Sequence, residues 1–401
     1  MERAQNRWKR RTALFLGGQA ITLFGSTIVQ MAIVWHVTLK TSSGGWVAAF
    51  TIAAYLPQFL ISFFAGVWAD RYDRKKLIIL ADGVIALATL MMFWAIPRIS
   101  SEPLMLTALL ATSIIRSLGA GVQTPAVNAA TPSLAPEENL ARVNGINATL
   151  QSIVQFAAPA VAGAVLSTGT FRSALLIDVA TALLGVGLLS CVVLPKQEAV
   201  KENASVWAEM KAGIAYSFSD KTIGKILTVY GLWILLSVPA GFMAALLVSR
   251  AYGGGYWRLT AVELVGFAGM ALGGAAMGIW GGFKSRVKTL AVGLLVVGAT
   301  TVVMGTAPYF LLYLAATFAY SVAVAVTQTA VMTLVQEKAE SATLGRVFGV
   351  MGAMYSGFLP LGMAIFGPLA DIAPLQAIIV GSGVALILTT LGLRAKNDLN
   401  C

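Results

Sequence analysis

Four ionisable side chains lie inside long apolar runs of the sequence. Arg116 lies about thirteen residues into one run, and Asp82, Asp178 and Glu263 each lie about six or seven residues into others. A lone cation at the centre of a bilayer costs about 2.5–3.5 kcal/mol on insertion scales, so Arg116 must face protein or water. A carboxyl in such surroundings can bind and release protons near neutral pH. The four residues are candidates for proton coupling; the alternatives are structural hydrogen bonding for Arg116 and helix-end pairing for the carboxylates.

Neutral polar residues follow one helical face in two other runs. Lipid would solvate such faces poorly, so they form either helix–helix contacts or the wall of a watery cavity. The two stripes are Gln19, Thr22, Ser26 and Gln30, and Asn144, Asn147, Gln151 and Gln155. The candidate cavity residues among these, with one from a third run, are Gln19, Ser26, Gln30, Gln123, Asn147 and Gln151.

Aromatic and methionine side chains are frequent in the C-terminal half. Such side chains form an adaptable apolar wall that suits varied ligands. They are also ordinary packing residues of membrane helices. The candidates for the cavity wall are Tyr230, Trp233, Phe267, Met270 and Met354.

The composition excludes most classes of soluble protein. Only 11% of the 401 residues are charged and 58% are hydrophobic, whereas soluble domains average about 25% and 45–50%. The net charge of +11 does not predict nucleic-acid binding, because the basic residues are scattered between apolar runs and form no basic domain. Two cysteines and one histidine provide no disulfide framework or metal-ligand cluster. We expect no cofactor and no metal.

The apolar runs predict an all-α integral membrane protein. A helix needs about 20 apolar residues to span a bilayer. Twelve runs meet this length, near residues 13–38, 44–69, 76–97, 103–128, 142–168, 171–194, 222–249, 257–282, 288–306, 308–335, 344–370 and 374–394.

The basic residues predict the orientation of these spans. If the runs alternate across the membrane, 22 of the 28 Lys and Arg residues fall on the side that holds both termini. Cytoplasmic segments carry the excess of Lys and Arg. We therefore expect a multi-pass protein of the bacterial cytoplasmic membrane with both termini in the cytoplasm. The opposite side has only Lys40, Arg98, Arg172, Arg250 and Arg258.

The two halves of the chain resemble each other. A polar linker, 195–221, separates six predicted spans in 1–194 from six in 222–401. "GVWADRYDRKKL" at residue 66 matches "GIWGGFKSRVKTL" at 278, "QTPAV" at 123 matches "QTAVM" at 328, and "ARVNG" at 141 matches "GRVFG" at 345. We therefore expect two six-helix bundles with parallel topology, related by an axis along the membrane normal.

The stretch that begins at residue 66 carries a family resemblance. Its pattern G-x-x-x-D-R-x-x-R-K-K resembles the signature loop of the major facilitator superfamily. Further stretches resemble the macrolide-efflux (Mef-type) branch: "IVQMAIVWHVTLKTSS", "IRSLGAGVQTPAVNAATPSLAPEENL" and "LGRVFG". The resemblance implies a conformational latch that closes the cytoplasmic side, whereas positive-inside topology alone would also explain the cations. The latch residues would be Gly66, Asp70, Arg71, Arg74 and Arg346.

Two positions depart from this loop pattern. Asp73 adds a negative charge where many superfamily members have glycine, and Gly282 stands where the second copy would have the equivalent of Asp70. We therefore expect an asymmetric latch. Arg116, Gly119 and Gly121 also resemble the superfamily motif R-x-x-G-x-G, which is associated with proton-coupled members.

The resemblance implies a secondary transporter that exports amphipathic drugs, such as macrolides, by proton antiport with alternating access. Siderophores and lysophospholipids are alternative substrates, and a membrane receptor or scaffold is the alternative without transport. An enzyme is not expected, because the chain has no G-x-x-x-x-G-K-[ST] loop and no H-E-x-x-H motif. The expected partners are a small amphipathic substrate, protons and membrane lipids. The sequence leaves open whether a separate ATP-binding partner assists.

Overall fold

The computed structural model describes residues 2–194, 220–340 and 343–395. These residues form α-helices, short 3-10 helices and connecting turns, and they contain no strand. Within this part of the chain, 12 helical spans are long and apolar enough to cross a membrane. The prediction of an all-α membrane protein with twelve spans is therefore confirmed.

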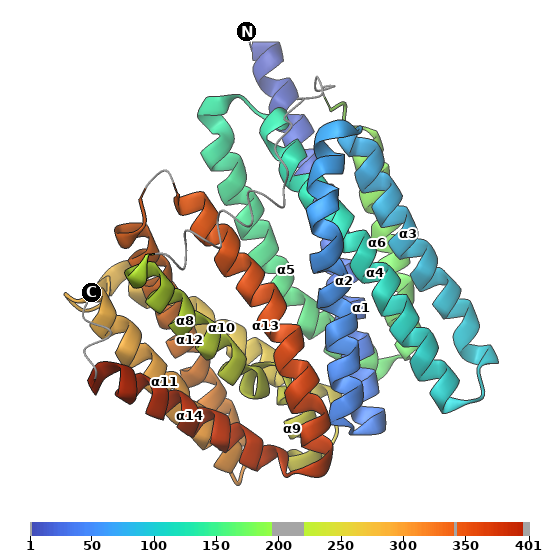
Figure 1. Ribbon diagram of the computed structural model, residues 1–401. Coiled ribbons are helices and arrows are strands. Elements are labelled where there is room, and N and C mark those ends of the chain that lie inside the picture. Colours follow the sequence, from blue (N-terminus) through green and yellow to red (C-terminus); the bar gives the residue numbers. More distant parts are fainter. Residues whose placement is uncertain (1, 195–219, 341–342, 396–401) are drawn as a thin grey trace. The chain divides into compact units, whose positions relative to one another are not determined.

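Figure 1 shows the helices in their order along the chain. The first group is α1 (Glu2–Thr41), α2 (Gly44–Arg71), α3 (Arg74–Ala95), α4 (Glu102–Ala130), α5 (Leu140–Thr168) and α6 (Phe171–Ser190). The second group is α8 (Lys221–Phe242), α9 (Ala244–Tyr252), α10 (Tyr256–Trp280), α11 (Arg286–Thr306), α12 (Phe310–Lys338), α13 (Leu344–Ile372) and α14 (Leu375–Ala395).

The seventh span differs from the single helix predicted over 222–249. The structure forms this span, Thr222–Tyr252, from two helices, α8 and α9. Pro239 lies in the last turn of α8. Since proline has no backbone N–H and its ring crowds the preceding turn, it weakens a helix interior. Helices α4 and α5 contain Pro125 and Pro159 and stay continuous, so Pro239 alone does not explain the break after Phe242.

The chain divides into two compact units. Unit 1 comprises Met1–Val37 and Phe50–Glu202, and unit 2 comprises Thr38–Ala49 and Asn203–Cys401. The turn between α1 and α2 thus belongs to unit 2, although both helices continue into unit 1. The predicted bundle boundaries at residues 194 and 222 stay a prediction, and most of the linker lies outside the described residues.

In unit 1, α3 packs against both α4 and α6 (Figure 1). Two glycines of α4 allow neighbouring helices to approach its backbone. A Cβ atom added at Gly119 would lie 2.6 Å from Cγ1 of Ile85 in α3. One added at Gly121 would lie 2.2 Å from Cγ2 of Ile61 and 2.7 Å from the carbonyl oxygen of Gln58, both in α2. The glycines after Arg116 therefore have a packing role.

Gly121→Ala should destabilise unit 1, because the added methyl group meets the backbone of α2. Overpacking of this kind costs about 1–3 kcal/mol. Thermal unfolding of the purified protein in detergent measures the effect. Gly83→Ala is the matched control, since a Cβ atom there meets no atom within 4 Å. Equal stability of the two variants would contradict the packing role of Gly121.

In unit 2, α11 packs against α12 and α14, α10 packs against α12, and α8 packs against α13 (Figure 1). One apolar cluster joins α8, α11, α12, α13 and α14. Its largest members include Tyr230, Trp233 and Met351, which are at most 5% exposed. This cluster gives the second group of helices a core of its own.

Candidate functional site

A buried ion pair lies at the centre of unit 1. Arg116 of α4 is 4% exposed and Asp178 of α6 is 1% exposed. One guanidinium nitrogen of Arg116, Nη1, donates to Oδ2 of Asp178 and to the hydroxyl of Thr89 in α3. The other, Nη2, donates to the hydroxyl of Ser26 in α1 over 2.9 Å and to its carbonyl oxygen over 3.2 Å. Four helices therefore supply this cluster.

Thr89 was not among the residues predicted from the sequence. Its hydroxyl has one proton and two acceptors within hydrogen-bond distance, Oδ2 of Asp178 at 2.8 Å and the carbonyl oxygen of Ile85 at 3.0 Å. A threonine in an apolar run resembles the many threonines that bond only to the preceding turn. The available signal was its spacing of seven residues from Asp82, which places both residues on one face of α3.

A second polar cluster surrounds Asp82, which is 1% exposed. The side-chain amide of Gln123 in α4 donates to Oδ1 of Asp82 over 3.1 Å and to Oε1 of Gln19 in α1 over 3.2 Å. The other carboxylate oxygen of Asp82 is buried and has no hydrogen-bond partner, and the same is true of the amide nitrogen of Gln19. No cation is among the contacts of Asp82 in the described part of the chain.

The two clusters form two polar layers through unit 1. Each of three helices contributes one residue to each layer. The two residues of a helix are seven positions apart, which places both on the same face. The pairs are Ser26 and Gln19 from α1, Thr89 and Asp82 from α3, and Arg116 and Gln123 from α4. Seven residues of α-helix rise about 10 Å. The sequence order is reversed in α4, so α4 runs antiparallel to α1 and α3. We call the Arg116 set the arginine layer and the Asp82 set the glutamine layer.

The layers differ in how they satisfy charge. Asp178 and Arg116 neutralise each other, and such a buried pair is costly to break from one side. Asp82 has one hydrogen bond and an electrostatic interaction with Asp178. A buried carboxyl without a cation is a group that can gain and lose a proton. Unit 1 thus contains a buried ion pair and, separately, a buried carboxyl that is not part of that pair.

The structure separates Glu263 from the other candidates for proton coupling. Glu263 lies in α10 of unit 2, and its side chain is exposed. Arg116, Asp82 and Asp178 all lie in unit 1, where Asp178 pairs with Arg116 and interacts electrostatically with Asp82. Within the described residues, no group of three or more His, Cys, Asp or Glu side chains could hold a metal ion.

The first two residues of α3 bind the ends of several helices of unit 1. Arg74 donates from Nε to the carbonyl oxygen of Ala69 over 2.8 Å and from Nη1 to that of Ala129 over 2.7 Å. Lys75 donates to the carbonyl oxygens of Ser190, the last residue of α6, and of Val192, over 2.8 Å each. Cations at the carbonyl ends of helices are electrostatically favourable. These two cations therefore have a structural role besides any role in topology.

Asp73, the departure from the family pattern, is the N-cap of α3. Its side chain accepts a hydrogen bond from the backbone N–H of Lys76 over 3.3 Å. Ser285, 212 positions later, caps α11 in the same way by accepting from the backbone N–H of Lys288 over 3.3 Å. The two copies of the repeat therefore begin their third helices with equivalent caps.

The second copy also repeats the arginine contact. Arg286 donates to the carbonyl oxygen of Gly281, five residues earlier, as Arg74 does to that of Ala69, and it pairs with Glu337 over 3.2 Å. Gly282, which replaces the carboxylate of the first copy, has φ = 85°. An L-residue with a side chain is strained in this region, so the turn explains the glycine.

The predicted latch is described only in part. The side chains of Asp70 and Arg346 lie outside the described residues. Arg71 is exposed, and a Cβ atom added at Gly66 would meet no atom within 4 Å. The closing role of these residues and of Arg74 stays a prediction.

The predicted cavity residues have different environments. Gln19, Gln123 and Ser26 belong to the two polar layers. Gln30 and Asn147 are half-buried, and Gln151 is exposed on α5. In unit 2, Tyr230 and Trp233 are buried in the apolar cluster, Phe267 and Met354 are half-buried, and Met270 is 52% exposed. Their roles in a substrate cavity stay a prediction.

Twelve spans in two compact units, the first of which contains a buried charged cluster, define a multi-pass membrane protein. The family model of the Major Facilitator Superfamily matches residues 13–359. The chain therefore belongs to the Major Facilitator Superfamily, and the resemblance in its loop motifs is confirmed.

Three comparisons describe its relatives. Macrolide efflux protein A of Streptococcus pyogenes is 29% identical over 374 residues, which are 91% of each chain. Enterobactin exporter EntS of Citrobacter koseri is 24% identical over 387 residues, 94% of this chain and 89% of that one. The crystal structure of a bacterial homologue of the iron transporter ferroportin in an inward-facing state has a TM-score of 0.76, with 15% identity and coverage of 96% and 98%. This last likeness concerns the fold alone.

Proposed function

We propose that this chain is a secondary active exporter of amphipathic drugs of the macrolide type and that it exchanges drug for protons. The similarity to macrolide efflux protein A over 91% of both chains supports the substrate class. The buried Arg116–Asp178 pair beside Asp82 supports proton coupling and carries the proposal. An ion pair inside a membrane span is costly, and such charges mark ion pathways.

The two buried carboxylates Asp82 and Asp178 have different roles in this proposal. Asp178 holds Arg116 and keeps the arginine layer intact. Asp82 gains and loses the proton, because no cation among its contacts holds it in the charged form. A change of charge at Asp82, about 10 Å from the arginine layer along the helices, then shifts the balance between two conformations.

The transport cycle would be alternating access, in which the half 1–194 rocks against the half 222–401. The charge distribution supports a position in the cytoplasmic membrane with both termini inside. The half-buried and exposed side chains Phe267, Met270 and Met354 would contribute an apolar wall for the drug. Closure of the cytoplasmic side would use the latch that includes Asp70, Arg74 and Arg346.

The test of this function is the accumulation of a radiolabelled macrolide in drug-sensitive bacteria with and without the protein. Expression should lower accumulation, and a protonophore should restore it, because the proton gradient drives export. Unchanged accumulation in cells that contain the protein would reject macrolide export. Low accumulation that persists with the protonophore would reject proton coupling and direct attention to a separate ATP-binding partner.

An exporter of siderophores is the second candidate function, because Enterobactin exporter EntS of Citrobacter koseri is similar over 94% of this chain. If macrolide accumulation is unchanged, labelled siderophores and then lysophospholipids are the ligands to assay in the same cells. Export of a siderophore with no effect on macrolides would select this alternative.

A further inference from the structure

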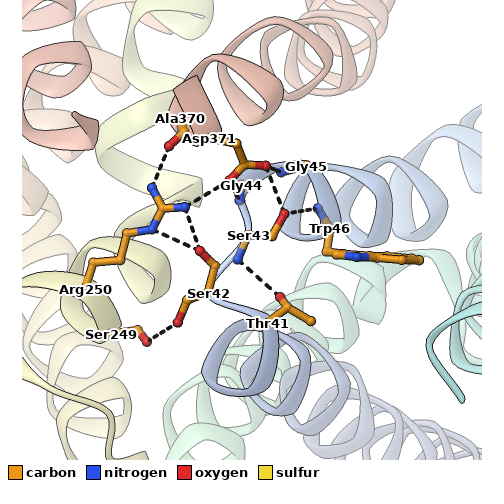
Figure 2. Close-up of polar contacts among 10 residues, drawn as sticks. All are labelled: Thr41, Ser42, Ser43, Gly44, Gly45, Trp46, Ser249, Arg250, Ala370 and Asp371. Carbon is orange, nitrogen blue, oxygen red and sulfur yellow. Dashed lines mark hydrogen bonds and ion pairs between the residues drawn. The ribbon is translucent and has the colours of Figure 1, made fainter. Parts of the chain in front are cut away.

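The turn between α1 and α2 is fastened by a carboxylate from α13. Two residues, Ser42 and Ser43, join the two helices. Asp371 accepts hydrogen bonds from the backbone N–H of Gly44 over 2.6 Å and of Gly45 over 2.8 Å, and from the hydroxyl of Ser43 over 2.9 Å (Figure 2). The carboxylate thus caps the N-terminus of α2, where a negative charge is electrostatically favourable.

A guanidinium from α9 fastens the same turn from its other side. Arg250 donates to the carbonyl oxygen of Ser42 from Nε over 3.0 Å and from Nη2 over 2.6 Å (Figure 2). It also donates to the carbonyl oxygen of Ala370 over 2.5 Å and to Asp371 over 2.9 Å. The hydroxyls of Ser42 and Ser249 lie 3.4 Å apart. The cation therefore lies at the carbonyl end of α1, where a positive charge is favourable.

The charges of Arg250 and Asp371 are complementary to the helix ends at the turn and to each other. The cation meets the C-terminal end of α1, the anion meets the N-terminal end of α2, and Arg250 and Asp371 form an ion pair. Ser42 has φ = 47°, a left-handed conformation that is uncommon for a residue with a side chain. Such a conformation persists where the surrounding contacts hold it.

Small residues bring the backbones of α2 and α13 into contact beside this cluster. A Cβ atom added at Gly44 would lie 2.3 Å from the carbonyl oxygen of Gly367. One added at Gly367 would lie 2.3 Å from the Cβ atom of Ala48. The start of α2 is therefore held to α13 by packing as well as by charge.

We propose that these contacts form an outer clasp that opens once in each transport cycle. The outer clasp comprises Ser42, Ser43, Gly44, Gly45, Arg250 and Asp371. This proposal rests on the alternating-access function proposed above and adds residues that set the balance between its states. Its turn lies on the side with few cations, which the charge distribution assigns to the outside.

The course of the chain is the reason why the outer clasp would open during transport. The turn belongs to unit 2, as do Arg250 and Asp371, whereas α1 before Thr38 and α2 after Ala49 belong to unit 1. Because α1 and α2 are continuous helices, a movement that carries each of them as a rigid rod away from α9 and α13 must break the outer clasp. The predicted cytoplasmic latch lies at the opposite end of α2, around Asp70. One helix would thus connect the closing contacts of both membrane faces, so that opening one favours closing the other.

Labelling of a buried cysteine tests this proposal without drug or proton gradient. The reporter is Val47→Cys, at a site that is 1% exposed, in a chain with Cys191→Ser and Cys401→Ser. Adding Asp371→Asn should raise the rate of labelling by a membrane-impermeant maleimide from outside by about tenfold, because the clasped state becomes less populated. Asp371→Ala should raise it further. Glu102→Gln, on the same predicted face but outside the clasp, should leave the rate unchanged.

An unchanged labelling rate in both Asp371 variants, with a normal elution profile in detergent, would overturn the proposal. Because this measurement needs no substrate, its failure would leave the proposed export function untouched. Conversely, failure of macrolide export in cells would leave the labelling result valid.

A reversible crosslink gives a second test. Ser42→Cys together with Ser249→Cys places two thiols where the hydroxyls lie 3.4 Å apart. Oxidation should stop export, and a reducing agent should restore it, because the disulfide keeps the clasp closed. Each single cysteine variant is the control and should export under both conditions. Normal export by fully crosslinked protein would show that the clasp need not open.

Discussion

Arg116→Ala is expected to abolish gradient-driven export and to destabilise unit 1. Among the described residues, the substitution leaves buried Asp178 with one side-chain partner, the hydroxyl of Thr89. Loss of one partner of a buried ion pair typically costs about 3–5 kcal/mol. Export is measured as protonophore-sensitive drug accumulation in cells, and stability by thermal unfolding of the purified protein.

A double substitution separates the functional role of Arg116 from its structural role. Arg116→Met with Asp178→Leu removes both charges, and such replacements of a buried pair are often neutral or stabilising. We expect stability to recover in the double variant and export to remain absent. If export also recovers, the arginine layer serves folding alone, and the coupling role of Arg116 is wrong.

The cytoplasmic latch gives a prediction of smaller effect. Asp70→Asn should lower export while membrane insertion and protein yield stay normal, because the change removes one charge at the end of α2 and no apolar packing. Tyr72→Phe, in the same loop, is a control that removes no charge. Normal export by Asp70→Asn would reject the latch and leave positive-inside topology as the reason for the loop cations.

The twelve spans could be predicted because hydropathy and charge asymmetry are properties of single segments. Arg116, Asp82 and Asp178 stood out for the same reason. Their pairing could not be predicted, because it depends on the register of α4 against α3 and α6. The sequence did not indicate which carboxylate pairs with Arg116; the structure pairs it with Asp178.

The outer clasp was missed for a related reason. Arg250 counted only as one of the few cations on its side, and Asp371 lies at the end of an apolar run with no basic residue near it in sequence. They are 121 positions apart, and their common target is the backbone of a turn more than 200 positions before Arg250. Backbone N–H and C=O groups are not distinguished by the sequence. A cap that a distant helix supplies to such groups can therefore be identified only in the three-dimensional structure.

Asp82→Asn is expected to uncouple drug movement from protons while the fold persists. Asparagine keeps an oxygen that can accept from Gln123, and no cation loses a partner, since Asp82 has none among the described residues. The variant in proteoliposomes should therefore exchange labelled drug for unlabelled drug at the wild-type rate. Its uptake driven by a pH gradient should fall to the level of vesicles without protein, because an amide cannot carry the proton.

Two matched variants make this result specific. Glu263→Gln should retain gradient-driven uptake, because Glu263 lies in unit 2, apart from the two polar layers. Asp178→Asn should lose stability, because Arg116 loses its partner. Gradient-driven uptake by Asp82→Asn would show that the proton binds elsewhere, and loss of that uptake in Glu263→Gln would identify the carboxylate of α10 instead. If Asp82→Asn lost exchange together with gradient-driven uptake, Asp82 would serve drug binding or the conformational change itself, and its role as proton carrier would be wrong.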